Sequence, residues 1–128
     1  MVHMKIKFLG IAGTVLMLAG PAFAHLSFAM FDYNKDVTIV GELKELKWTN
    51  PHIHLLVNVP NGRGGMVEWD VEGGTPGNLR RNGWSRDVVK QGEKVSVVIH
   101  PLKNGTTGGM LVRASRGDGT AIGGNAGG

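Results

Sequence analysis

Two neighbouring segments of the sequence alternate between apolar and polar residues with a period of two. His52–Val59 (HIHLLVNV) has an apolar residue at every odd position, and Met66–Glu72 (MVEWDVE) places two valines and Trp69 at every second position. The intervening residues 60–65 (PNGRGG) are turn formers. Because successive side chains of a strand point to opposite faces, the pattern predicts a β-hairpin with one buried face, and that face contains Trp69.

Three more segments have the composition of strands, and their order along the chain indicates a fold. Val37–Leu46 alternates around Gly41, a glycine typical of a bend or bulge, and Val95–Pro101 and Met110–Ser115 follow the hairpin. A short helix is expected over Arg86–Lys90. Three strands, a helix and two strands is the order of an OB-like barrel. We therefore predict a mainly all-β fold, a small five-stranded OB-like barrel with one short helix. A small open sandwich of the same strands is the alternative.

The first 24 residues have the features of a cleavable signal peptide. Lys5 and Lys7 form a positive start, residues 8–20 (FLGIAGTVLMLAG) carry no charge, and residues 21–24 (PAFA) end in the small-x-small pattern that signal peptidase recognises. The apolar run is too short to cross a bilayer comfortably, so we expect cleavage after Ala24 and no transmembrane segment in the mature chain. The expected location is periplasmic or secreted.

The mature chain is expected to hold one domain with a short segment on either side. Residues 25–36 form an N-terminal arm with the apolar anchors Phe28, Met30 and Phe31, and residues 37–116 form the OB-like domain. Residues 117–128 are rich in glycine, and we expect them to be a disordered tail.

Composition argues against several classes of function. Cleavage removes Lys5 and Lys7 but no acidic residue, so the net charge falls from +4 to +2, and the remaining charges of both signs are interspersed. A nucleic-acid partner is therefore not expected. The chain has no cysteine, which excludes disulfides, thiolate catalysis and cysteine-ligated metals. No serine lies in a nucleophile motif, so we predict no catalytic residue, and an enzyme is the less expected class.

Five motifs occur in a specific order along the mature chain: AHLSFAMFD, WTNPHIHLLVNV, VEWDVE, NLRRNGW and VIHPLKNG. In these the chain resembles a family of short exported bacterial proteins, catalogued as a domain of unknown function, whose signature is Ala-His-His-Ser-Phe with Trp-x-Asn-Pro-His. The resemblance implies an exported small β domain and implies no activity. Leu26 stands where the family usually has a second histidine, which weakens any role that needs two adjacent N-terminal histidines.

Histidines are the residues that suggest chemistry. Cleavage after Ala24 makes His25 the mature N-terminus, and its free α-amine and imidazole are neutral nitrogens that suit Cu(II). One more imidazole, from His52, His54 or His100, completes a three-nitrogen histidine brace. In the other interpretation, His25 is simply the residue beside a cleavage site.

The hairpin brings two of these histidines to carboxylates. His52 and His54 share the face opposite the apolar one, and pairing of the two strands places His54 near Asp70 and His52 near Glu72. Carboxylates in this position orient metal-bound imidazoles. The other interpretation is charge pairing on a solvated face, which stabilises by at most about 1 kcal/mol.

Aromatic and basic residues form a third group. Trp48 and Trp84 lie in polar, turn-like contexts and can line a ligand-binding surface with Arg80, Arg81 and Arg86. Alternatively, the two tryptophans plug the ends of the barrel.

Two hypotheses about function follow from these features. The first is an exported binding or accessory module whose partner is a protein, a peptide or a small anionic ligand. The second is a copper-binding protein that uses His25.

Overall fold

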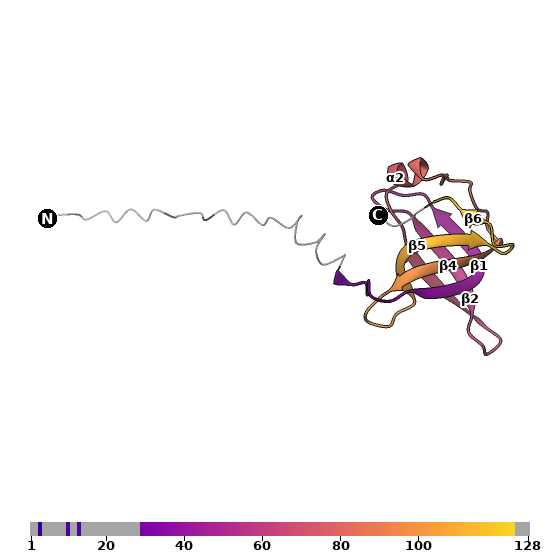
Figure 1. Ribbon diagram of the computed structural model, residues 1–128. Helices are drawn as coiled ribbons and strands as arrows, with labels where there is room; N and C mark the ends of the chain where they lie inside the picture. The colour runs from indigo at the N-terminus through magenta and orange to yellow at the C-terminus, as the bar shows by residue number, and fades with distance from the viewer. Residues whose placement is uncertain (1–2, 4–9, 11–12, 14–28, 125–128) are drawn as a thin grey trace.

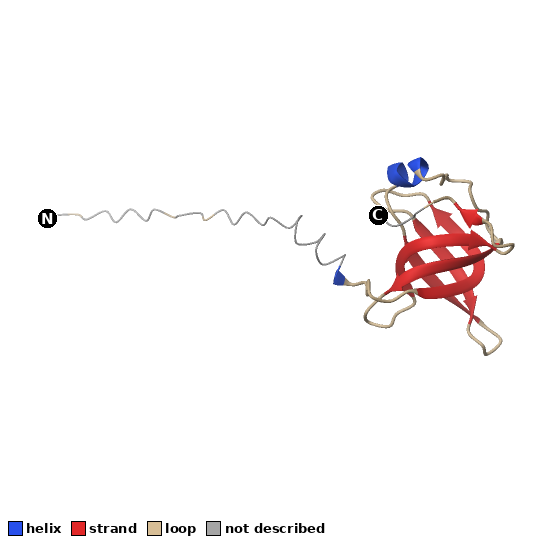
Figure 2. Cartoon of the chain, in the orientation of Figure 1, coloured by secondary structure: helices blue, strands red, loops and turns tan. Residues whose placement is uncertain are grey.

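The computed structural model describes residues 29–124 together with the isolated residues 3, 10 and 13. His25, Phe28, residues 125–128 and nearly all of the expected signal peptide lie outside the described residues. Within the described residues, six strands and one short helix follow each other in the order β1 (Val37–Lys47), β2 (His54–Pro60), β3 (Met66–Glu72), α2 (Pro76–Arg81), β4 (Lys94–Pro101), β5 (Gly108–Arg116) and β6 (Ala121–Ile122). Figures 1 and 2 show the strands wrapped around one another, with α2 at one end.

Five of the strands close into a barrel. β1 pairs antiparallel with both β2 and β4, β2 pairs antiparallel with β3, and β5 pairs antiparallel with β4. The barrel closes where β5 also pairs in parallel with β3. Three strands, a helix and two strands in this pairing order confirm the predicted OB-like barrel. The β3–β5 pairing excludes the open sandwich, because a sandwich would leave these two edges apart.

β1 bends in order to pair on both sides. Its first half, to Glu42, pairs with β4, whereas its second half pairs with β2. A register shift lies between Leu43 and Glu45, and a side chain at Gly41 would overlap the backbone carbonyl of Asn58 in β2. The predicted bend at Gly41 therefore has a physical cause, the close approach of two backbones where the barrel curves.

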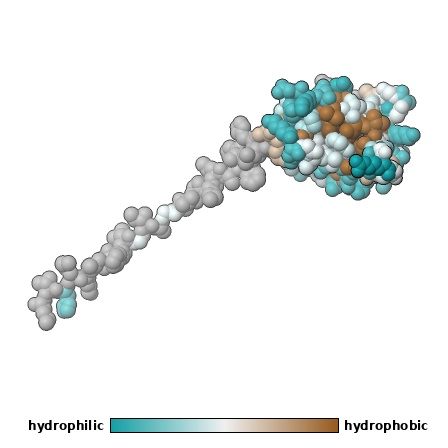
Figure 3. All heavy atoms as spheres, turned by 90° about the horizontal axis from the view of Figure 1, so that it is seen from below, coloured by the Kyte–Doolittle hydropathy of each residue, from teal (hydrophilic) through white to brown (hydrophobic). Residues whose placement is uncertain are grey.

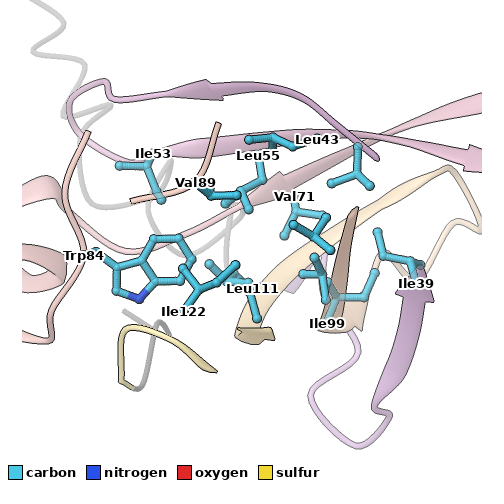
Figure 4. Close-up of a cluster of buried hydrophobic side chains, with 14 of the residues drawn as sticks. Ile39, Leu43, Ile53, Leu55, Val71, Trp84, Val89, Ile99, Leu111 and Ile122 are labelled. Atoms are coloured by element: carbon cyan, nitrogen blue, oxygen red, sulfur yellow. The ribbon is translucent and has the colours of Figure 1, made fainter. Parts of the chain in front are cut away.

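The inward faces of the strands form one continuous core. Of the predicted apolar positions of the hairpin, Leu55, Val57 and Val71 are fully buried in it, whereas Val59 packs against it and Val67 is only half-buried. Trp69 is half-buried and packs against the core from its edge. Figure 4 shows Trp84 and Ile122 with the strand residues of this cluster, so segments outside the barrel strands close one end of it. Figure 3 shows apolar residues gathered within a hydrophilic surround on one outer face.

The predicted position of the helix is wrong. The helix is α2, ten residues earlier than expected, and residues 86–90 form turns. Thr75 caps α2, its hydroxyl accepting from the Asn78 amide at 3.3 Å, and Pro76 occupies the first turn. In the predicted segment the Val88 carbonyl accepts a hydrogen bond from the Arg116 guanidinium instead of a following amide. A tertiary contact thus replaces the local bond that a helix needs.

The prediction of a disordered tail is also wrong for residues 117–124. A turn at Asp118 leads into β6, which pairs with β5, and Ile122 is fully buried. The hydroxyl and the amide of Thr120 both donate to the Asp118 carboxylate. These hydrogen bonds, that of the hydroxyl most of all, lower the pKa of the Asp118 carboxyl. The reason for the error is that Ile122, a single apolar residue among glycines, is enough to dock the segment on the end of the barrel.

Candidate functional site

A groove of about 270 Å³ lies on the outer face of the barrel, between β3 and the loop that joins β4 to β5. In OB-like barrels the face of the second and third strands and the loops beside it bind ligands. The lining comes from four parts of the chain, namely the arm (Met30, Phe31), β2 (His54), β3 (Asp70, Glu72) and the segment from Leu102 to Gly109 (Leu102, Thr106, Thr107, Gly108, Gly109).

Backbone hydrogen bonds hold the β4–β5 loop against β3. The Asp70 amide donates to the Thr107 carbonyl at 3.1 Å, and the Thr107 hydroxyl donates to the Glu68 carbonyl at 2.9 Å. A side chain at Gly108 would crowd the Asp70 carbonyl, so this close approach requires glycine. The loop is thereby one rigid wall of the groove.

The arm forms another part of the rim, next to the β4–β5 loop. Phe31 is 4% exposed and forms an isolated bridge with Leu102. The Lys103 amide donates to the Met30 carbonyl at 2.9 Å, and the Asp32 amide donates to the Pro101 carbonyl at 2.8 Å. Of the two expected anchors that the structure describes, only Phe31 is buried and holds the arm. Met30 is 51% exposed at the groove.

Two histidines are held by carboxylates of β3. His54 Nδ1 lies 2.7 Å from Asp70 Oδ1, and His52 Nδ1 lies 2.7 Å from Glu72 Oε1. These are the predicted contacts, although β2 begins at His54, so His52 lies just before the strand. An ionised carboxylate only accepts hydrogen bonds, so Nδ1 carries the proton in both pairs. In a neutral imidazole this leaves the lone pair on Nε2, as in metal-bound histidines whose other nitrogen donates to a carboxylate.

His100 is oriented in the same way but lies elsewhere. Its Nδ1 is 2.9 Å from the Lys35 carbonyl and 3.2 Å from Asp36 Oδ1, and its ring packs edge-on against Tyr33. The pairing His54–Glu72–Met110–His100 crosses three strand intervals. Measured along the sheet, His54 and His100 are therefore about 14 Å apart at the backbone. The straight-line distance is shorter because the barrel is curved, and side chains diverge on its convex outer surface.

A complete metal site is not formed by these residues alone. In the described part of the chain, no three His, Asp or Glu side chains come together in a way that could hold a metal ion. His52 and His54 are neighbours, and His100 is separate from them. Tyr33, which packs against His100, is close enough to Glu72 to feel its charge. Partial burial, and to a smaller extent the negative charge of Glu72, raise the pKa of the Tyr33 phenol.

The predicted tryptophan–arginine surface is only partly assembled. Trp84 is 2% exposed and belongs to the core, so its assignment to the surface is wrong and the alternative, that it plugs an end of the barrel, is right for this residue. Trp48 is half-buried, and the Arg80 guanidinium lies 5.7 Å from the centre of its ring. Arg81 is bound to Asn78 on its own helix, and Arg86 is exposed in a turn.

Met30 and the β4–β5 loop are parts of the groove that were not predicted from the sequence. The loop could have been found, because it lies between the fourth and fifth strands of the predicted OB-like barrel, a position used for binding. The position of Met30 has no such signal, since it depends on where the arm docks.

The comparisons with known proteins give a family and add no activity. Residues 12–113 match a family of unknown function, DUF6152. The chain belongs to this family. DUF6152 is thus the domain of unknown function that the five motifs indicated. No curated protein and no solved structure matches the chain. None of the helices in the described part of this DUF6152 member is long and apolar enough to span a bilayer.

Proposed function

We propose that this DUF6152 protein is an exported copper-binding module, in which His25 at the mature N-terminus and His54 of the groove supply the nitrogen ligands. Export rests on the signal peptide expected over residues 1–24. Metal binding rests on one observation above all. His54 lines the groove, one-third exposed, with its Nδ1 held by Asp70 at 2.7 Å. This fixes the ring and directs Nε2 away from the carboxylate, as the chemistry of a histidine ligand requires.

The covalent chain favours His54 as the partner of His25. Met30 lines the same groove as His54, and His25 precedes Ala29 by four residues. Four residues reach at most roughly 14 Å, a length that allows His25 to reach the groove from Ala29. His52 is next to His54 and is the second choice. His100 is the least suitable of the three, because the arm residues Lys35 and Asp36 hold it on another part of the surface.

The available ligands favour copper over harder cations. An α-amine and two imidazoles are neutral nitrogen donors, and such sites bind Cu(II) more tightly than other divalent ions of the first transition row. Calcium and magnesium require several oxygen ligands. Asp70 and Glu72 already accept hydrogen bonds from imidazoles, so they are suited to orienting histidines rather than to forming an oxygen cage.

The test is titration with Cu(II), followed by electron paramagnetic resonance, of the processed protein that begins at His25. We expect tight one-to-one binding with a nitrogen-rich signal. A version that retains Ala24 has no free amine on His25, and its affinity should fall by at least about 10–100-fold, the cost of losing even an indirect metal contact. His54→Ala should have a similar effect, whereas His100→Ala, the matched control, should bind like the wild type.

Equal, weak binding by all four proteins would contradict the proposal. The binding-module hypothesis would then remain, with the exposed Arg80 over Trp48 as the surface for an anionic partner. A guanidinium over an indole face offers both charge and a flat apolar contact, which supports that second candidate. Trp84 takes no part in it, because it is buried.

A further inference from the structure

Two methionines of the described chain expose about half of their surface, and only one of them is beside a histidine. Met30 is 51% exposed and lines the groove together with His54. Met66 is 58% exposed and lines a different groove, formed with Val40, Pro60 and Lys94, in which no histidine takes part. Exposure alone therefore does not set Met30 apart, and what distinguishes it from Met66 is the imidazole that lines the same groove.

The backbone of Met30 is fixed while its side chain is free to adjust. The Lys103 amide donates to the Met30 carbonyl, and the next residue, Phe31, is buried against the β4–β5 loop. The methionine side chain is unbranched, with three rotatable bonds, and it can place its sulfur over a range of positions at the groove. His54, which lines the same groove, is held by Asp70 and cannot adjust in this way. The groove thus combines one fixed imidazole and one adjustable thioether.

This pair of donors is selective for soft, monovalent ions. Thioether sulfur favours Cu(I) over the harder divalent ions, and imidazole accommodates copper in either oxidation state. We propose that the groove binds Cu(I) through Met30 Sδ and His54 Nε2. The inference rests on the proposed metal-binding function and extends it, because the α-amine of His25 favours Cu(II) whereas Met30 favours Cu(I). His54 is common to both sites.

The experiment uses Ag(I), a redox-inert ion with the same closed d shell and the same preference for sulfur as Cu(I). Cleavage leaves three methionines, Met30, Met66 and Met110, so the methionine methyl region of a carbon–proton NMR spectrum contains three signals. On titration of the processed protein with Ag(I), the Met30 signal should move and saturate at one equivalent. The signals of exposed Met66 and of Met110, which is 8% exposed, should stay in place.

Matched variants assign the effect to the sulfur. Met30→Leu keeps the size and apolar character of the side chain, and it should lower Ag(I) affinity about tenfold or more, measured by competition with a chelator. Met66→Leu should leave it unchanged. Cu(II) binding that depends on the free amine should survive in Met30→Leu, whereas His54→Ala should weaken the binding of both ions.

The outcomes separate the two proposals. Equal Ag(I) affinity for the wild type and both leucine variants would overturn the Cu(I) site, and amine-dependent Cu(II) binding in the same proteins would leave the proposed function intact. Loss of Ag(I) affinity in Met30→Leu with no amine-dependent Cu(II) binding would support the Cu(I) site and contradict the role of His25. Failure to bind either ion would overturn both.

Discussion

Two carboxylates determine which ring nitrogen each histidine of the hairpin offers to a ligand. Asp70 and Glu72 lie on the outer face of β3, where Asp70 contacts His54 and Glu72 contacts His52. Neither contact joins directly paired residues, since the backbone partner of His54 is Glu72 and that of Asp70 is Leu56. The side chains reach diagonally along the ladder, a distance that long polar side chains span. Replacement of one carboxylate should therefore release one imidazole without disturbing the sheet.

We predict that Asp70→Ala weakens Cu(II) binding by the processed protein about 10–100-fold, because the His54 ring loses the acceptor that orients it. The carboxylate of Asp70 is 58% exposed, so the free energy of unfolding should change by less than about 1 kcal/mol. Competition with a chelator gives the affinity and urea unfolding gives the stability. Asp36→Ala, beside His100, is the control, and an equal loss of affinity there would refute the role of Asp70.

The arm is the element before β1 that lines the groove, with Met30 and Phe31. It is fixed by Phe31. This side chain is buried between the arm and the outer surface of the barrel and does not belong to the main core cluster. Backbone hydrogen bonds from Asp32 and Lys103 complete this attachment. The ring of Tyr33 packs edge-on on both Phe31 and His100 but is 47% exposed. One buried side chain therefore carries most of the attachment.

Phe31→Ala should lower the free energy of unfolding by about 3 kcal/mol, the usual cost of removing a buried aromatic ring. The amides of Asp32 and Lys103 should exchange with deuterium faster than in the wild type, and by a larger factor than the amides of the barrel strands, because only the arm loses its anchor. Tyr33→Ala should cost only about 1 kcal/mol, in keeping with its exposure. Unchanged exchange at Lys103 in Phe31→Ala would show that the arm is held by something else.

Taken as a whole, the molecule is a barrel that its own C-terminal segment helps to close. Trp84 fills the end beside α2, and Gly123 crosses the edge of its indole so closely that a side chain there would overlap the ring. Gly123 also has a φ of +63°, which disfavours any residue with a Cβ. β6 and the glycine after it are thus matched to the shape of Trp84.

A comparison of two glycines tests this closure. Gly119 also has a positive φ, +88°, but a side chain there would meet open space. Gly119→Ala should cost roughly 1 kcal/mol for the backbone conformation alone. Gly123→Ala should cost about 3 kcal/mol, because overlap with a packed ring adds to it. Urea unfolding followed by tryptophan fluorescence measures both, and equal costs would mean that Gly123 does not press on Trp84.

Local pattern was sufficient for the strands and for the histidine–carboxylate pairs. The period of two assigns faces along β2 and β3, and the short turn between them leaves one pairing that matches the apolar faces. His52 and His54 could for this reason be placed next to Glu72 and Asp70 from the sequence. The helix was misplaced because α2 is only six residues long, and the cap at Thr75 and the proline after it are weak local signals.

Only the tertiary structure decided how distant segments meet. The groove exists because β3 pairs with β5 and because Phe31 docks on Leu102, contacts between segments that are about 40 and 70 residues apart. Burial of Trp84 likewise depends on Gly123, almost 40 residues later. Alternation along a strand states which face is apolar, but it does not state which segment will cover that face. That choice is made by the shape and packing of the assembled barrel.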